Sequence, residues 1–102
     1  MSLTVGELLR KQRENKGLLL REVAAALAMD TALLSKYERN ERQLSKDQLY
    51  AFATYYKADA EEFLLAWLSD KVAYEVKGEP LAKEALREAG KKILTNKKKS
   101  NK

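Results

Sequence analysis

The sequence contains neither cysteine nor histidine, and it has only one proline and four glycines among its 102 residues. Without cysteine and histidine the chain cannot form disulfide bonds, the usual zinc sites or a catalytic triad built on an imidazole, so we do not expect an enzyme. No apolar stretch approaches the ~18 residues that span a bilayer, and the first residues lack the basic-then-apolar order of a signal peptide. We therefore expect one soluble, cytoplasmic protein without a metal or a cofactor.

Positive charge is in excess but unevenly distributed. The chain has 20 Lys and Arg against 15 Asp and Glu, a net charge of +5, which favours an anionic partner such as nucleic acid. Residues 1–57 carry ten basic and seven acidic side chains, residues 58–90 carry four and eight, and residues 91–102 carry six and none. The last of these segments has little to bury, and we predict that residues 96–102 form a basic, disordered tail.

Apolar and polar residues do not alternate along any sustained stretch, which predicts an all-α protein. Thr4 with Glu7, and Ser45 with Gln48, have the spacing of capping boxes, in which each side chain satisfies a free backbone N–H at a helix start. The expected helices run from Thr4 toward Gly17, over residues 20–28, 31–39 and 45–56, from Asp59 to Lys77, and from Pro80 onward.

Two short helices joined by a tight turn, the second starting after a capping Asp30, are the parts of a helix-turn-helix reader. The run from Glu7 to Leu65 resembles the XRE-type helix-turn-helix domain of Cro and phage repressors. The matching residues are Leu18, Glu22-Val23-Ala24, Leu34-Ser35-Lys36-Tyr37-Glu38-Arg39, Leu49, Ala53 and Phe63-Leu64. The resemblance implies a lambda-repressor-like bundle of five helices with an additional C-terminal helix. It places the DNA-binding domain at residues 4–65 and a C-terminal extension at residues 66–95.

The resemblance also implies which residues touch DNA. Helix 31–39 would lie in the major groove, and its base-contacting positions would be Thr31, Ala32, Ser35 and Lys36. Their chemistry suits this role, because lysine can donate to guanine, hydroxyl groups can donate or accept, and the alanine methyl can meet a thymine methyl. Three cations near the following turn would bind phosphates: Arg39, Arg42 and Lys46.

Arg13 and Glu38 occupy positions that in such domains pair between the first and third helices, which would fix the reading helix on its scaffold. Leu19 and Leu20 stand where a small polar cap and a glutamine usually open the second helix, so the familiar cap and phosphate contact are missing. Backbone N–H groups at that helix start could still bind phosphate. Ala28 replaces the usual turn glycine and is expected to carry some strain.

Such readers commonly bind DNA as symmetric dimers. The predicted interface lies beyond the shared module and comprises Phe63, Trp67, Leu68, Val72 and Leu86. An alternative is a monomer in which the last helix folds back on the one before it.

The sequence thus predicts a dimeric, sequence-specific regulator of transcription that binds double-stranded DNA at an inverted repeat, most simply as a repressor. The alternative is a protein–protein or antitoxin-like module on the same scaffold, supported by Leu19, Leu20 and Leu33 near the expected DNA face. The carboxylate pairs Glu61/Glu62 and Asp70/Glu75 have no nucleophile or metal ligand beside them and are interpreted as helix-face charges. The lysine tail lacks the aromatic anchors of a membrane-surface segment.

Overall fold

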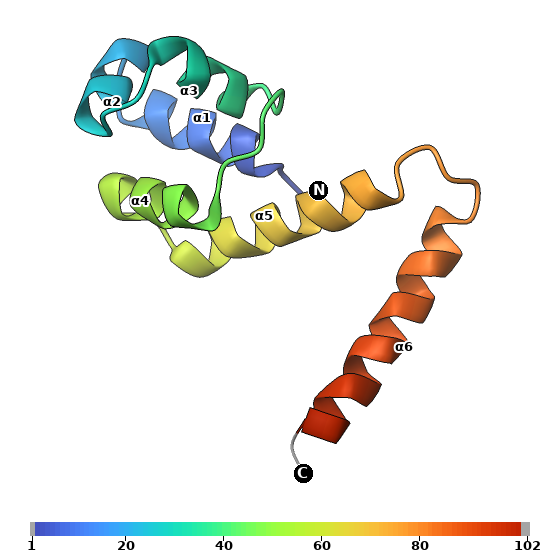
Figure 1. Cartoon of the computed structure of the whole chain (residues 1–102). Helices are drawn as coiled ribbons and strands as arrows, with labels where there is room; N and C mark the ends of the chain where they lie inside the picture. Colours follow the sequence, from blue (N-terminus) through green and yellow to red (C-terminus); the bar gives the residue numbers. More distant parts are fainter. Residues whose placement is uncertain (1, 101–102) are drawn as a thin grey trace. The chain divides into compact units, whose positions relative to one another are not determined.

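The computed structural model describes the backbone of residues 2–100 and the side chains of residues 2–94, and this part of the chain contains six helices and no strand (Figure 1). The helices are α1 (Val5–Asn15), α2 (Leu20–Ala26), α3 (Thr31–Glu38), α4 (Lys46–Tyr56), α5 (Ala60–Glu75) and α6 (Ala82–Ser100). The all-α prediction is confirmed. The chain divides into two compact units, Met1–Lys71 and Val72–Lys102, which are described separately below.

α1 and α4 begin at the two predicted capping boxes. The Thr4 hydroxyl accepts from the Glu7 N–H at 3.1 Å, and the Glu7 carboxylate accepts from the Thr4 N–H at 2.9 Å. Ser45 and Gln48 make the equivalent two bonds at 3.1 and 2.9 Å. The structure ends α2 two residues earlier than predicted, because Ala28 adopts a left-handed conformation with φ 54°.

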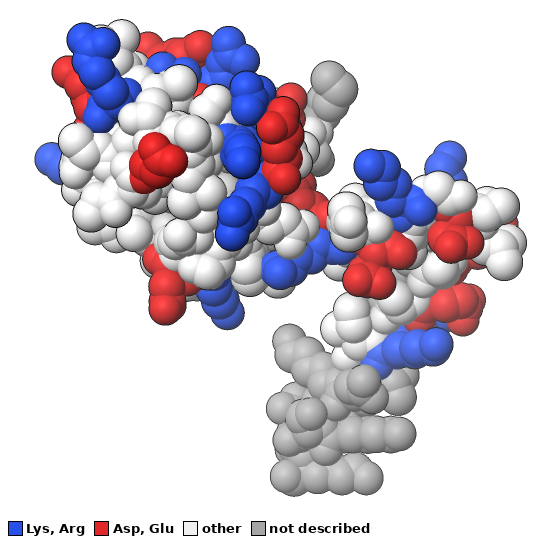
Figure 2. Space-filling model, turned by 45° about the horizontal axis from the view of Figure 1, so that its top comes forward, with Lys and Arg blue, Asp and Glu red and all other residues white. Residues whose placement is uncertain are grey.

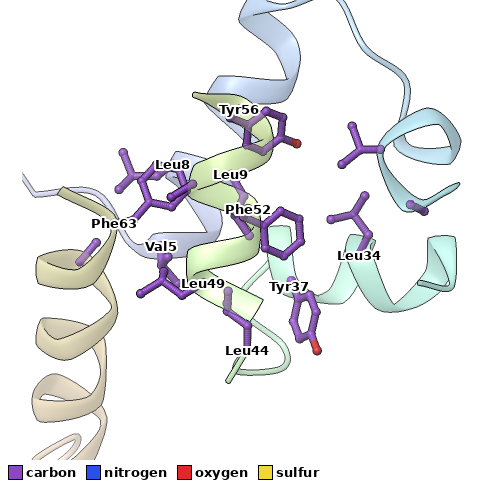
Figure 3. Packing of buried hydrophobic residues seen from close by; sticks show 14 residues of the cluster. Val5, Leu8, Leu9, Leu34, Tyr37, Leu44, Leu49, Phe52, Tyr56 and Phe63 are labelled. Carbon is purple, nitrogen blue, oxygen red and sulfur yellow. The ribbon is translucent and has the colours of Figure 1, made fainter. Parts of the chain in front are cut away.

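The core of the first unit is built by α1 to α5 around the ring of Phe52. Leu34 of α3 lies beside this ring (Figure 3), and the Tyr37 and Phe52 rings meet edge to face with centroids 6.4 Å apart. Phe63 of α5 is also fully buried in this core. The prediction that Phe63 belongs to a dimer interface is therefore wrong, since its side chain packs inside its own chain.

α5 is joined to the start of α1 by a hydrogen bond between segments distant in the sequence. The Val5 N–H donates to the Asp70 carboxylate at 2.9 Å. Burial raises the pKa of Asp70 above its usual value; the bond from Val5 opposes this shift, and the nearby Glu7 charge adds to it. Asp70, interpreted from the sequence as a solvated charge, thus helps to attach α5 to α1.

The second unit contains the last turn of α5, a loop that includes Gly78 at φ 79°, and α6. Apolar side chains on α6 and in the loop before it are exposed, among them Leu81 at 67% and Leu86 at 40%. The helix continues to Ser100 and so enters segment 96–102, which the sequence predicts to be a disordered tail. The side chains of residues 95–100, and residues 101–102 altogether, lie outside the described part of the structure.

Candidate nucleic-acid interface

α3 presents one face to the core and another to solvent. Leu34 and Tyr37 are 0% and 3% exposed, and Asp30 caps the helix by accepting from the Ala32 N–H at 3.4 Å. Of the predicted base-contacting residues, Thr31, Ala32 and Lys36 are exposed and Ser35 is half-buried. The four side chains thus lie on the solvent side of a short helix whose other side is anchored in the core.

An ion pair holds α3 on α1. Arg13 Nε lies 2.8 Å from Glu38 Oε2, and Arg13 Nη2 donates to Glu38 Oε1 at 3.0 Å, so the contact is bidentate. Nη1 of the same guanidinium donates to the Leu18 carbonyl at 3.0 Å. The side chains of Arg13 and Glu38 are only 14% and 5% exposed, and the hydrogen bond to Glu38 raises the pKa of Arg13 above its usual value. The predicted pair is therefore present, and it also fixes the segment that leads into α2.

Gly6 allows α1 and α3 to approach closely, a feature that sequence reasoning missed. A Cβ atom placed on Gly6 would collide with the backbone carbonyl oxygen of Tyr37 and lie 2.8 Å from that of Glu38. Beside this contact, Asn40 takes φ 60° and its side-chain amide donates to the Thr4 hydroxyl at 2.7 Å. The end of α3 is thus held against the start of α1. A glycine inside a predicted helix was the only available sign of this packing.

The three predicted phosphate contacts are all exposed: Arg39 directly follows α3, Arg42 lies in the loop between α3 and α4, and Lys46 is the first residue of α4. α5 supports this loop, because the Trp67 indole N–H donates to the carbonyl of the buried Leu44 at 2.8 Å. Lys71 lies over the Trp67 ring, 4.4 Å from its centroid. Trp67, predicted to belong to the dimer interface, is half-buried against the core of its own chain.

Acidic groups are also present on this side of the molecule. Figure 2 brings the top of Figure 1, with α2 and α3, toward the viewer and shows basic side chains with acidic ones directly beside them. Arg39 and Glu41, which follow α3, form an exposed ion pair: Nε lies 3.1 Å from Oε2, and Nη2 donates to Oε1 at 3.1 Å. No role for Glu41 was predicted from the sequence.

The start of α2 is capped by a carboxylate in place of a hydroxyl. Leu19, which is 48% exposed, offers no side-chain cap, and its N–H donates to the Glu22 carboxylate at 2.7 Å. The prediction that this helix start could bind a phosphate is thus weakened, because Glu22 already occupies one of its donors.

No group of three or more acidic or other ligand side chains that could hold a metal ion is found among the described residues. Within the same part of the chain, no helix is long and apolar enough to cross a membrane.

A comparison with protein families matches residues 4–65 to a family described as helix-turn-helix domain. The chain belongs to this helix-turn-helix family. The match includes α1 to α4 and the first part of α5, and so contains all the residues predicted to touch DNA. Searches of curated proteins and of solved structures gave no match. Membership of the helix-turn-helix family supports a DNA-binding regulator.

Proposed function

We propose that the protein is an XRE-type regulator of transcription that binds double-stranded DNA with α3 in the major groove, most simply as a repressor. The observation that carries this proposal is the anchoring of α3: its inner face is buried and its end is tied to α1, while Thr31, Ala32 and Lys36 face solvent. A short helix held in this way can enter a groove without rearranging.

Within this proposal, base edges are contacted by Thr31, Ala32, Ser35 and Lys36, and phosphates by Arg39, Arg42 and Lys46. The proposal is supported by the exposure of Thr31, Ala32 and Lys36, and by the three exposed cations that lie between the end of α3 and the start of α4. Such a protein would act inside the cell, on chromosomal DNA.

We propose further that two copies bind an inverted repeat, with reading helices about one DNA turn, roughly 34–36 Å, apart. Leu68 and Val72 of α5 and Leu86 of α6 are 46%, 48% and 40% exposed in the single chain. These side chains and the exposed part of Trp67 form the proposed interface, because covering apolar surface from water favours association. The resemblance to XRE-type regulators supports control of a neighbouring operon as part of this proposal.

The experiment is selection of binding sites from a randomised duplex library, followed by the same selection with Lys36→Ala. We expect a two-fold symmetric consensus, and loss of preference at one position of each half-site, equivalent to about 1–3 kcal/mol, in the variant. Lys46→Ala is the matched control, since it should weaken binding to all sequences and reduce the slope of log affinity against log salt by about one. An unchanged consensus with Lys36→Ala would contradict the assignment of the reading residues.

The alternative is a protein-binding module on the same scaffold, and the exposed Leu19 beside the proposed DNA face favours it. Leu20 and Leu33 support it less, because both pack against the core. Binding to the selected repeat that falls steeply with salt would exclude this alternative, since counterion release accompanies contacts to phosphate.

A further inference from the structure

We propose that Glu41 limits the affinity of the domain for DNA by competing with backbone phosphate for the guanidinium of Arg39. This inference rests on the proposed DNA-binding function. It assigns a role in DNA binding to Glu41, an acidic residue beside the cations that are proposed to bind phosphate.

The backbone at the end of α3 fixes the position of Glu41. Asn40 is left-handed at φ 60°, and the Glu41 N–H turns back to donate to the Lys36 carbonyl at 2.9 Å. Asn40 is held in turn by its bond to Thr4. The backbone of Glu41 is therefore fixed at the C-terminal end of the proposed reading helix by bonds to α3 and, through Asn40, to Thr4 at the start of α1. This fixed backbone keeps the Glu41 carboxylate within reach of Arg39.

The contact uses the donors that a phosphate would need. Arg39 Nη2 donates to Glu41 Oε1 at 3.1 Å and Nε lies 3.1 Å from Oε2, so the carboxylate covers the same edge of the guanidinium that would bind a phosphate. Approach of DNA would then require either that this pair opens or that the Glu41 charge stays close to a phosphate. Both possibilities lower affinity, and neither depends on base sequence.

The pair contributes little to folding, since the two side chains are 56% and 53% exposed. Replacing Glu41 with glutamine should therefore leave the fold intact, and the backbone bond to Lys36 does not involve the carboxylate. This separates an effect on binding from an effect on stability.

The chain offers a closely matched control. Arg10 and Glu14 of α1 form an exposed pair at 3.0 Å, with side chains 62% and 53% exposed. Glu41→Gln and Glu14→Gln change the net charge by the same amount and each remove one partner of an exposed arginine pair. Only Glu41 lies at the exit of α3.

The test is titration of a fixed, arbitrary DNA duplex with wild type, Glu41→Gln and Glu14→Gln over a range of salt concentrations. Glu41→Gln should bind about three- to tenfold more tightly at low salt, with the log–log salt slope steeper by up to about one. Glu14→Gln should remain within about twofold of wild type, as expected for a charge outside the interface. In an Arg39→Ala background, the gain from Glu41→Gln should shrink.

Equal effects of Glu41→Gln and Glu14→Gln would overturn the inference and leave the proposed function standing, because net charge alone would explain the gain. The inference would also be overturned, with the proposed function left standing, if the wild type binds DNA and Glu41→Gln binds it no more tightly. Absence of DNA binding by all three proteins would overturn both the inference and the proposed function. A melting temperature measured for each variant confirms that the compared proteins are folded.

Discussion

Gly6 is a position at which one methyl group decides how closely two helices approach. It lies in the first turn of α1, where the backbone carbonyls of Tyr37 and Glu38 occupy the space that a side chain would need. Backbone atoms cannot move aside as a flexible side chain can, so a larger residue here must displace the end of α3.

We expect Gly6→Ala to lower the free energy of unfolding by at least about 2 kcal/mol, although alanine is the better helix former. Lys11→Ala, on an exposed position of the same helix, is the control and should change stability by less than about 0.5 kcal/mol. Denaturant unfolding of the two variants measures both values. A Gly6→Ala protein as stable as wild type would mean that α1 and α3 are less closely packed than described.

Residues whose interactions are local in the sequence could be predicted, and those that depend on distant segments mostly could not. The capping boxes at Thr4 and Ser45 could be predicted because each joins residues three positions apart, and the structure confirms both. The Arg13–Glu38 pair was found only through the resemblance to a family. The close approach at Gly6 and the Trp67–Leu44 bond gave no local pattern, since their partners lie 23 or more residues away.

At the scale of an element, α3 owes its orientation to a charged contact beneath it. The Arg13 side chain is only 14% exposed, and its guanidinium bonds both to Glu38 and to the Leu18 carbonyl. Removing its acidic partner leaves a cation with little access to water, which is far more costly than the net value of the intact pair.

Glu38→Ala should therefore reduce the free energy of unfolding by about 3 kcal/mol. Glu14→Ala removes the partner of the exposed Arg10 and should cost less than about 1 kcal/mol. Thermal or denaturant unfolding of both variants provides the comparison. Similar losses in the two would indicate that the buried position of the Arg13–Glu38 pair has no energetic importance.

α5 shows why the faces of some helices cannot be assigned from sequence. Residues 63–68 are six apolar positions in succession, so periodicity does not indicate which of them turn inward. The structure buries Phe63 and Ala66 and leaves Leu65 and Leu68 exposed. Which side chains of α5 are buried depends on how the helix packs on α1 and α4, including the bond from Val5 to Asp70. The apolar pattern of α5 alone carries no information about these contacts.

At the scale of the whole molecule, most of the exposed large apolar side chains among the described residues lie on α5, on α6 or in the loop between them. Leu68, Val72 and Leu86 are each at least 40% exposed, and the proposed dimer would cover them. Because they contribute little to the core, polar substitutions there should affect association more than folding.

We expect the wild type to sediment as a dimer at micromolar concentration and Leu68→Glu to sediment as a monomer with a melting temperature within a few degrees of wild type. DNA affinity should fall with the loss of the second reading helix. Tyr50→Glu is the control, because Tyr50 is 40% exposed on α4 and outside the proposed interface, and it should remain dimeric. A wild-type protein that is monomeric at all concentrations would contradict the proposed dimer.

A single hydroxyl group connects the beginning of one helix with the end of another. The Thr4 oxygen accepts from the Glu7 N–H at the start of α1 and from the Asn40 amide at the end of α3. Opening of the first turn of α1 should therefore be coupled to opening of the turn at Asn40, which follows α3. Amide protons at these two places, 36 residues apart in sequence, should exchange with solvent in concert.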